Sequence, residues 1–218
     1  MNPSRLEALI FDMDGVIVDS EPLHERAFRA VFAEIGHANT HGVNFPSYYG
    51  QSDVLLWRDF IARHRPPHTL EELLARKERR FDALLRAEEP IFSGLEELLE
   101  NAAHRFPLGL ASGSRHPTIN SVLALRNLRR HFRAIVSSED VPRGKPDPDI
   151  FLRTAQLLGV EPARCCVIED SAAGVEAARA AGMTVIAITN SLPAEKLSQA
   201  TRVVSTYGQL EQLLLQSG

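Results

Sequence analysis

Chemically capable side chains follow four separate apolar runs of this sequence. Asp12 and Asp14 come directly after residues 8–11, within Phe-Asp-Met-Asp-Gly-Val. In a strand, residues two apart point to the same side, so both carboxylates can face one crevice. Close carboxylates repel each other, so one can act as an anionic nucleophile and metal ligand while the other holds a proton. A strand that simply ends at a polar turn is the alternative.

Hydroxyl and basic residues follow two further apolar runs. Ser112, Gly113 and Ser114 come after residues 108–111, where a hydroxyl and exposed backbone amides suit a phosphate oxygen. The same residue types also cap ordinary helices. Lys145 lies in the stiff loop Gly-Lys-Pro-Asp-Pro. Its compact ammonium can hold a phosphate and screen it from an attacking carboxylate, although a surface lysine is the generic alternative.

Glu169 and Asp170 end a fourth apolar run, residues 165–168. Together with Asp12 and Asp14 they offer an all-oxygen cluster that suits Mg²⁺. Acidic residues at a helix start are the alternative, because they are favourable near the helix dipole. Each alternative is reasonable alone, but all four together would require an accident at four strand ends. The pattern therefore predicts a magnesium and phosphate site.

The elements that must position these residues alternate along the chain. Short runs rich in Ile, Val and Ala predict buried parallel strands, and helical patterns separate them. This alternation predicts an α/β fold with a doubly wound parallel sheet. The predicted strands are residues 8–11, 108–111, 134–136, 165–168, 184–188 and 202–204, and the predicted helices of the core are 117–128, 150–158, 172–181 and 208–215.

One segment breaks the alternation and predicts a second domain. Residues 21–89 hold helix-like runs at 23–35, 54–63 and 70–85, and Gly and Pro residues separate these runs. We expect a catalytic core of residues 1–20 and 90–218, with residues 21–89 inserted as an α-helical cap.

Composition limits the classes of partner. The 218 residues are 44% hydrophobic and 24% charged, which is enough to bury a core. A net charge of −4 gives no field that attracts nucleic acid or anionic membranes, so neither is expected as a partner. We find no secretory signal and no apolar run of transmembrane length, and we expect a cytoplasmic monomer or weak dimer. Cys165 and Cys166 are adjacent in an apolar run and are expected to be structural thiols.

The four motifs, in this order, resemble those of the haloacid dehalogenase superfamily, and the inserted segment resembles its small helical cap. The resemblance implies a Rossmann-like core and a phosphatase that uses Mg²⁺. It also implies roles for individual residues. By this resemblance, Asp12 is the nucleophile and Asp14 is the general acid and then the general base. Ser112 and Lys145 hold the phosphoryl group. Mg²⁺ binds the Asp12 carboxylate, the Asp14 backbone carbonyl and Asp170, with Glu169 close by.

Within the superfamily, the sequence is similar to the group of beta-phosphoglucomutase and small sugar-phosphate phosphatases. This resemblance implies substrate contacts for Gly113, Ser114, His24 and Lys77, although a solvated helix face is an equal alternative for Lys77. The mutases carry an arginine after the Gly-x-Ser of the cap, where this chain has Asp53, whose charge is expected to repel a second phosphate.

We therefore expect hydrolysis of a small phosphate monoester, a sugar phosphate or a phosphoglycolate-like compound, through an aspartyl phosphate. A phosphosugar mutase is the first alternative. A non-catalytic protein that binds a phosphorylated metabolite is an alternative of another class, because fold alone does not guarantee activity.

Overall fold

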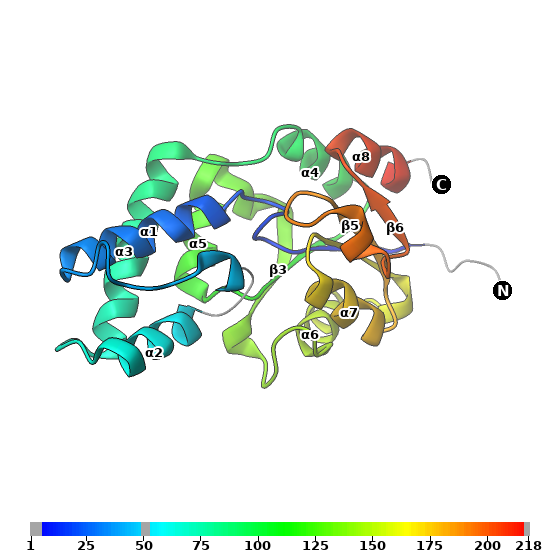
Figure 1. The fold of residues 1–218 in the computed structure, drawn as a ribbon. Helices are drawn as coiled ribbons and strands as arrows, with labels where there is room; N and C mark the ends of the chain where they lie inside the picture. The colour runs from blue at the N-terminus through cyan, green and yellow to red at the C-terminus, as the bar shows by residue number, and fades with distance from the viewer. Residues whose placement is uncertain (1–5, 49–52, 216–218) are drawn as a thin grey trace. The chain divides into compact units, whose positions relative to one another are not determined.

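The computed structural model describes residues 6–48 and 53–215. These form two compact units (Figure 1). One unit combines Met1–Asp19 with Ile91–Gly218 and is called the core unit below; the other, Ser20–Pro90, is called the cap unit. The Gly-x-Ser segment before Asp53 lies outside the described residues.

The core unit is built on one parallel sheet. Within the described residues it has six strands in the order β3-β2-β1-β4-β5-β6. The strands are β1 (Ala8–Phe11), β2 (Leu108–Ser112), β3 (Phe132–Ser137), β4 (Cys165–Glu169), β5 (Thr184–Ile188) and β6 (Arg202–Val204). This confirms the predicted strands and the doubly wound α/β class. β3 begins two residues earlier than predicted, because it lies at the sheet edge and exposes Arg133 between the buried Phe132 and Ala134.

Helices cover both faces of this sheet. Ala8 and Ile10 of β1 pack into one apolar cluster with α6 (Asp149–Leu158) and α7 (Ala172–Ala180). On the opposite side of the sheet, α4 (Leu95–Ala103) and α8 (Tyr207–Leu215) pack against each other (Figure 1). The buried strands therefore alternate their side chains between two apolar layers, as the period of two requires.

Two helices of the core unit differ from the sequence-based expectation. The predicted helix 117–128 ends early: α5 spans His116–Ala124, and a 3₁₀ segment, η2 (Leu125–His131), follows it. Arg126 and Asn127 have φ of 48° and 55°, and this left-handed backbone cannot continue an α-helix. Helix α4 was not predicted, although its buried Leu95, Leu98, Leu99 and Ala102 have the spacing of an amphipathic helix.

The cap unit is helical, with α1 (Glu21–Glu34), η1 (Phe45–Tyr48), α2 (Asp53–His64) and α3 (Leu70–Glu88). It has its own apolar core, centred on five packed aromatic residues: Phe28, Phe32, Phe45, Trp57 and Phe60. A capping box of Thr69 and Glu72 starts α3. Among the helices described, none is both long and apolar enough to cross a bilayer.

Candidate active site

The sheet order brings three of the four motifs to neighbouring strand ends. β1 lies between β2 and β4, so Asp12 after β1 is flanked by Ser112 at the end of β2 and Glu169 at the end of β4. The Asp12 amide donates to the Ile168 carbonyl at 3.0 Å, which extends the β1–β4 pairing by one residue. Ligand sites in open parallel sheets form at the carboxyl ends of the strands, where the strand order reverses.

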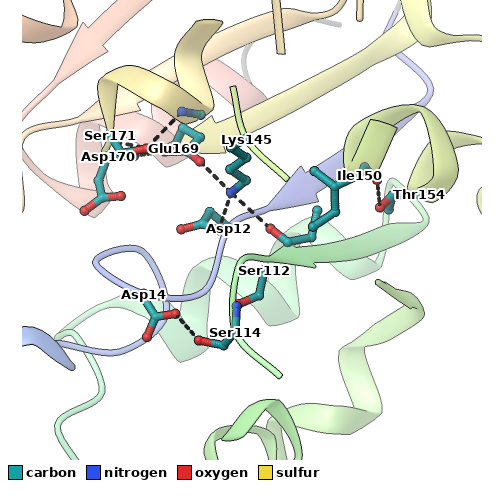
Figure 2. Close-up of polar contacts among 12 residues, drawn as sticks. Asp12, Asp14, Ser112, Ser114, Lys145, Ile150, Thr154, Glu169, Asp170 and Ser171 are labelled. Carbon is teal, nitrogen blue, oxygen red and sulfur yellow. Dashed lines mark hydrogen bonds and ion pairs between the residues drawn. The ribbon is translucent and has the colours of Figure 1, made fainter. Parts of the chain in front are cut away.

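Lys145 connects these strand ends (Figure 2). Its ammonium donates to Asp12 Oδ1 at 2.5 Å, to Glu169 Oε1 at 2.7 Å and to the Ala111 carbonyl at 3.2 Å. Desolvation opposes the charge of this lysine, but the carboxylates of Asp12 and Glu169 outweigh it and raise the Lys145 pKa. Lys145 is therefore a permanent cation in the site, and the alternative of a solvated surface lysine is wrong.

Glu169 is completely buried and fixed at both carboxylate oxygens. One oxygen accepts from Lys145, and the other accepts from the Asp170 amide at 2.8 Å, the Ser171 amide at 2.8 Å and the Ser171 hydroxyl at 2.9 Å. The first turn of α7 leaves space for it, because a Cβ at Gly174 would overlap the Glu169 carboxylate. A glycine at this helical position therefore serves the geometry of the acid.

The acids around Lys145 form a candidate cation site. In the part of the chain that the structure describes, carboxylate oxygens of Asp12, Glu169 and Asp170 lie within 4.8 Å of one another. Burial, with the Glu169 and Asp12 charges adding to it, raises the pKa of Asp170, whose carboxylate also accepts from Ser191. Burial raises the pKa of Asp12 to about 7, against the opposing effect of Lys145. Asp12 and Lys145 lie 2.5 Å apart, and at this distance they form an ionised pair.

This donor set fits a magnesium ion. Lys145 pairs with two of the three carboxylates, Asp12 and Glu169, so the ionised cluster keeps an excess of negative charge in a buried place. A buried charge needs a partner, and hard carboxylate oxygens are the preferred ligands of Mg²⁺. Asp12 and Asp170 are the residues that would hold such an ion, because both oxygens of Glu169 are occupied by hydrogen bonds.

Asp14 lies apart from that cluster and is held by the second motif (Figure 2). The Ser114 hydroxyl donates to Asp14 Oδ2 at 2.8 Å, and the Ser114 amide donates to the buried Ser112 hydroxyl at 3.0 Å. Apart from its two chain neighbours, no described residue has a heavy atom within 4 Å of where a Cβ on Gly113 would stand, so this side of the glycine is open. The core motif residues are thus gathered around the β1 strand end.

Two residues that sequence reasoning missed also support the site. Ser191 donates to the Asp170 carboxylate, and Asn190 donates to the Gly15 carbonyl at 2.7 Å. Gly15, with φ of 75°, lies against both Asp170 and Ser191 and leaves no room for a side chain. The missed signal was positional: Asn190 and Ser191 follow β5 at the same edge of the sheet, and the strand-end rule applies to them as well.

The remaining predicted site residues lie in the cap unit and contact one another. Lys77 is 2% exposed, which rules out the solvated helix face. Its ammonium donates to Asp53 Oδ2 at 2.6 Å, contacts His24 Nδ1, and lies 4.9 Å from the Phe81 ring centroid. The His24 ring stacks on Phe81. The expectation that Asp53 acts as a bare repelling charge is therefore corrected, because a paired lysine neutralises it.

Comparison with known proteins agrees with this geometry. The haloacid dehalogenase-like hydrolase family matches residues 6–182. The chain is 34% identical over 190 residues to fructose-1-phosphate phosphatase YqaB of Escherichia coli, covering 84% of this chain and 96% of that protein. It is 32% identical over 197 residues to beta-phosphoglucomutase of Bacillus subtilis, covering 86% and 85% of the two chains.

A solved structure is also similar to this chain. CbbY from Rhodobacter sphaeroides, in complex with xylulose-(1,5)bisphosphate, superposes with a TM-score of 0.81 at 25% identity, over 94% of this chain and 96% of that one. The fold and the site define an α/β hydrolase with a buried acidic centre. The chain belongs to the haloacid dehalogenase-like hydrolases, and its named sugar-phosphate phosphatase relatives support phosphatase activity.

Proposed function

We propose that this protein is a magnesium-dependent phosphatase that hydrolyses a small sugar phosphate monoester through a phosphorylated Asp12. The observation that carries the proposal is the buried arrangement of Asp12, Lys145, Glu169 and Asp170 at adjoining strand ends. It provides a nucleophile, a fixed cation and acidic ligands in one place, which is what phosphoryl transfer requires. A cytoplasmic location and a monomer or weak dimer complete the proposal.

The first step transfers the phosphoryl group to the enzyme. An oxygen of the Asp12 carboxylate attacks phosphorus, the bond between phosphorus and the sugar oxygen breaks, and Asp14 gives its proton to that oxygen. In the second step Asp14 takes a proton from water, the water oxygen attacks phosphorus, and the bond between phosphorus and the Asp12 carboxylate oxygen breaks. Inorganic phosphate leaves, and both aspartates return to their starting state.

Lys145 and the second motif hold the transferring group. The Lys145 ammonium, already 2.5 Å from Asp12, offsets the negative charge of the phosphoryl oxygens as the nucleophile approaches. The Ser112 hydroxyl and the backbone at Gly113 are the proposed phosphate ligands. Mg²⁺ bound by Asp12, Asp170 and the Asp14 carbonyl would neutralise further charge on the transferring group. Glu169 orients Lys145 and the start of α7.

We propose that His24 of the cap unit contacts the sugar part of the substrate, and that the buried Lys77 holds the His24 ring through its contact with Nδ1. The Asp53–Lys77 pair leaves this cluster without a net positive charge to grip a second phosphate. This favours a monophosphate and hydrolysis. The similarity to beta-phosphoglucomutase keeps a phosphosugar mutase as the second candidate.

The test is a panel of hexose, hexitol and pentose monophosphates and phosphoglycolate, with Mg²⁺ and without any bisphosphate. We expect phosphate release that a chelator stops and that added Mg²⁺ restores. Sugar-phosphate isomers are followed in the same samples. If hexose 1- and 6-phosphates interconvert faster than phosphate appears, the protein is a mutase. If no substrate releases phosphate, the phosphatase proposal is wrong.

A further inference from the structure

The carboxylate of Asp14 is oriented by a chain of hydrogen bonds that crosses three strand ends. The Ser114 hydroxyl donates to Asp14 Oδ2 at 2.8 Å. Ser114 itself is fixed on both sides of its peptide backbone. Its amide donates to the Ser112 hydroxyl at 3.0 Å, and its carbonyl accepts from the Ser137 hydroxyl at 2.8 Å.

The other end of this series of hydrogen bonds, at Ser137, is also anchored. The amide of Ser137, at the end of β3, donates to Asp140 Oδ2 at 2.8 Å, and the other oxygen of Asp140 pairs with His116 Nε2 at 2.9 Å. Ser112, at the end of β2, is completely buried. Ser114 therefore has little freedom to move, and its hydroxyl presents a fixed donor to Asp14.

We propose that Ser114 is a positioning residue for Asp14 in the proposed phosphatase reaction, on which this inference rests. Because the hydroxyl donates to Oδ2, that oxygen is kept as an acceptor, and the proton that goes to the leaving group is carried on Oδ1. Asp14 is not part of the group of carboxylates formed by Asp12, Glu169 and Asp170, and its carboxylate accepts from Ser114 instead. Orientation of this kind matters because a small misplacement of an acid reduces proton transfer steeply.

How much the reaction needs a general acid depends on the leaving group of the substrate. A sugar or alkyl phosphate expels a strongly basic oxygen that needs a proton, whereas a nitrophenyl phosphate expels a stable anion that does not. The ratio kcat/KM covers only the steps up to the first transfer to Asp12, so it separates this proton donation from the later attack by water. A loss of orientation at Asp14 should therefore depend on the substrate.

The experiment measures kcat/KM of Ser114→Ala on an alkyl phosphate and on p-nitrophenyl phosphate, with saturating Mg²⁺. We expect a loss of about 10- to 100-fold for the alkyl ester and a change within about twofold for the aryl ester. Ser114→Thr keeps a hydroxyl and should recover most of the loss. Retained aryl phosphate activity shows in the same sample that the variant is folded.

Thr154→Val is the matched control, since it removes a buried hydroxyl that donates to the Ile150 carbonyl within α6, at 2.8 Å. It should leave both substrates unchanged. An equal loss on both substrates, a rise in KM alone, or no change for Ser114→Ala would overturn the positioning role. Absence of phosphate release by the native protein from either ester would instead overturn the proposed function, and this inference with it.

Discussion

At the scale of single residues, the site contains more negative than positive charge. Asp12, Glu169 and Asp170 are buried close together, and Lys145 offsets only part of their charge. The energetic cost of burying these groups is tolerated because each carboxylate has a hydrogen-bond donor: Lys145 for Asp12, backbone amides for Glu169 and Ser191 for Asp170. The excess negative charge is what makes a divalent cation part of the proposed chemistry.

Replacing Asp12 with Asn tests the nucleophile. The amide keeps the shape of the side chain but removes the attacking oxygen anion, so turnover should fall to below about one thousandth of the native rate. Thermal unfolding of the variant should still be cooperative, which shows that the fold persists. Phosphate release within about tenfold of the native rate would exclude Asp12 as the nucleophile.

Asp170→Ala tests the proposed Mg²⁺ site. Loss of one hard oxygen ligand should raise the Mg²⁺ concentration for half-maximal activity by about tenfold or more. Ser191→Ala removes only the donor to this carboxylate and should give a smaller shift in the same direction. The measurement is a Mg²⁺ titration of the initial rate for all three proteins. Coincident titration curves would remove Asp170 from the metal site.

At the scale of elements, a glycine in the first turn of a helix leaves the space that an acid of the site occupies. Gly174 in α7 faces the Glu169 carboxylate so closely that any side chain would overlap it. The strand end supplies the acid, and the helix start supplies the Ser171 donors that hold it. Neither element alone would fix Glu169 against Lys145.

Gly174→Ala should therefore lower the free energy of unfolding by about 1–3 kcal/mol through overpacking, although alanine favours helices. Activity should fall as well, because Glu169 must move away from Lys145. Gly208→Ala in α8 is the matched control: apart from its chain neighbours and the backbone of its own helix, no described atom lies within 4 Å of the added Cβ, so stability should rise by about 0.5–1 kcal/mol. Chemical denaturation measures both. Equal effects of the two alanines would contradict the packing argument.

In the cap unit, the Asp53–Lys77 pair joins the start of α2 to α3. The side chain of Lys77 is 3% exposed and that of Asp53 is 34% exposed. Asp53→Asn leaves a buried ammonium without its anion, which should cost about 1–3 kcal/mol, less than for a fully buried pair because Asp53 is partly solvated.

Lys77→Met completes the double-mutant cycle for this pair. Once the ammonium is gone, Asp53→Asn should cost little, so the double variant should be more stable than the sum of the single changes predicts. The quantity compared is the free energy of unfolding from denaturant titration of all four proteins. Strict additivity would show that the two side chains do not stabilise each other.

At the scale of the whole molecule, the chain packs as two units with separate apolar cores. Both cysteines belong to the core unit, adjacent on β4 in the interior of the sheet, and both are buried free thiols, as expected from the sequence. Burial raises the pKa of Cys165 to about 11 and that of Cys166 to about 12. Reactive thiolate is therefore scarce in the folded core.

Thiol labelling should consequently report the opening of the core unit. In the native protein at neutral pH, both thiols should react with an aromatic disulfide reagent far more slowly than a free thiol, because the sheet must open first. In denaturant, both thiols should react rapidly. The rate in increasing denaturant should follow unfolding of the core. Rapid labelling in native conditions would contradict the closed packing around β4.

The sequence alone was sufficient for the sheet and for the core motif residues. Apolar runs of strand length, each followed by acidic, hydroxyl or basic residues, predicted Asp12, Ser112 and Glu169 at one edge, because parallel strands align their carboxyl ends. No such rule covers partners chosen by packing. Asp14 and Ser114 are 100 residues apart, and Asp53 and Lys77 are 24 apart.

Only the tertiary structure decided these pairings, and the Asp53–Lys77 pairing changed an interpretation. Taken by itself, Asp53 predicts repulsion of a phosphate; beside the buried Lys77 it is half of a neutral pair. Likewise, the sequence placed Gly174 only within the predicted helix 172–181, while the structure shows that its lack of a side chain leaves space for Glu169. Periodicity determines which side of an element a residue faces, but the partner it meets depends on rotamers and on the distance between packed elements.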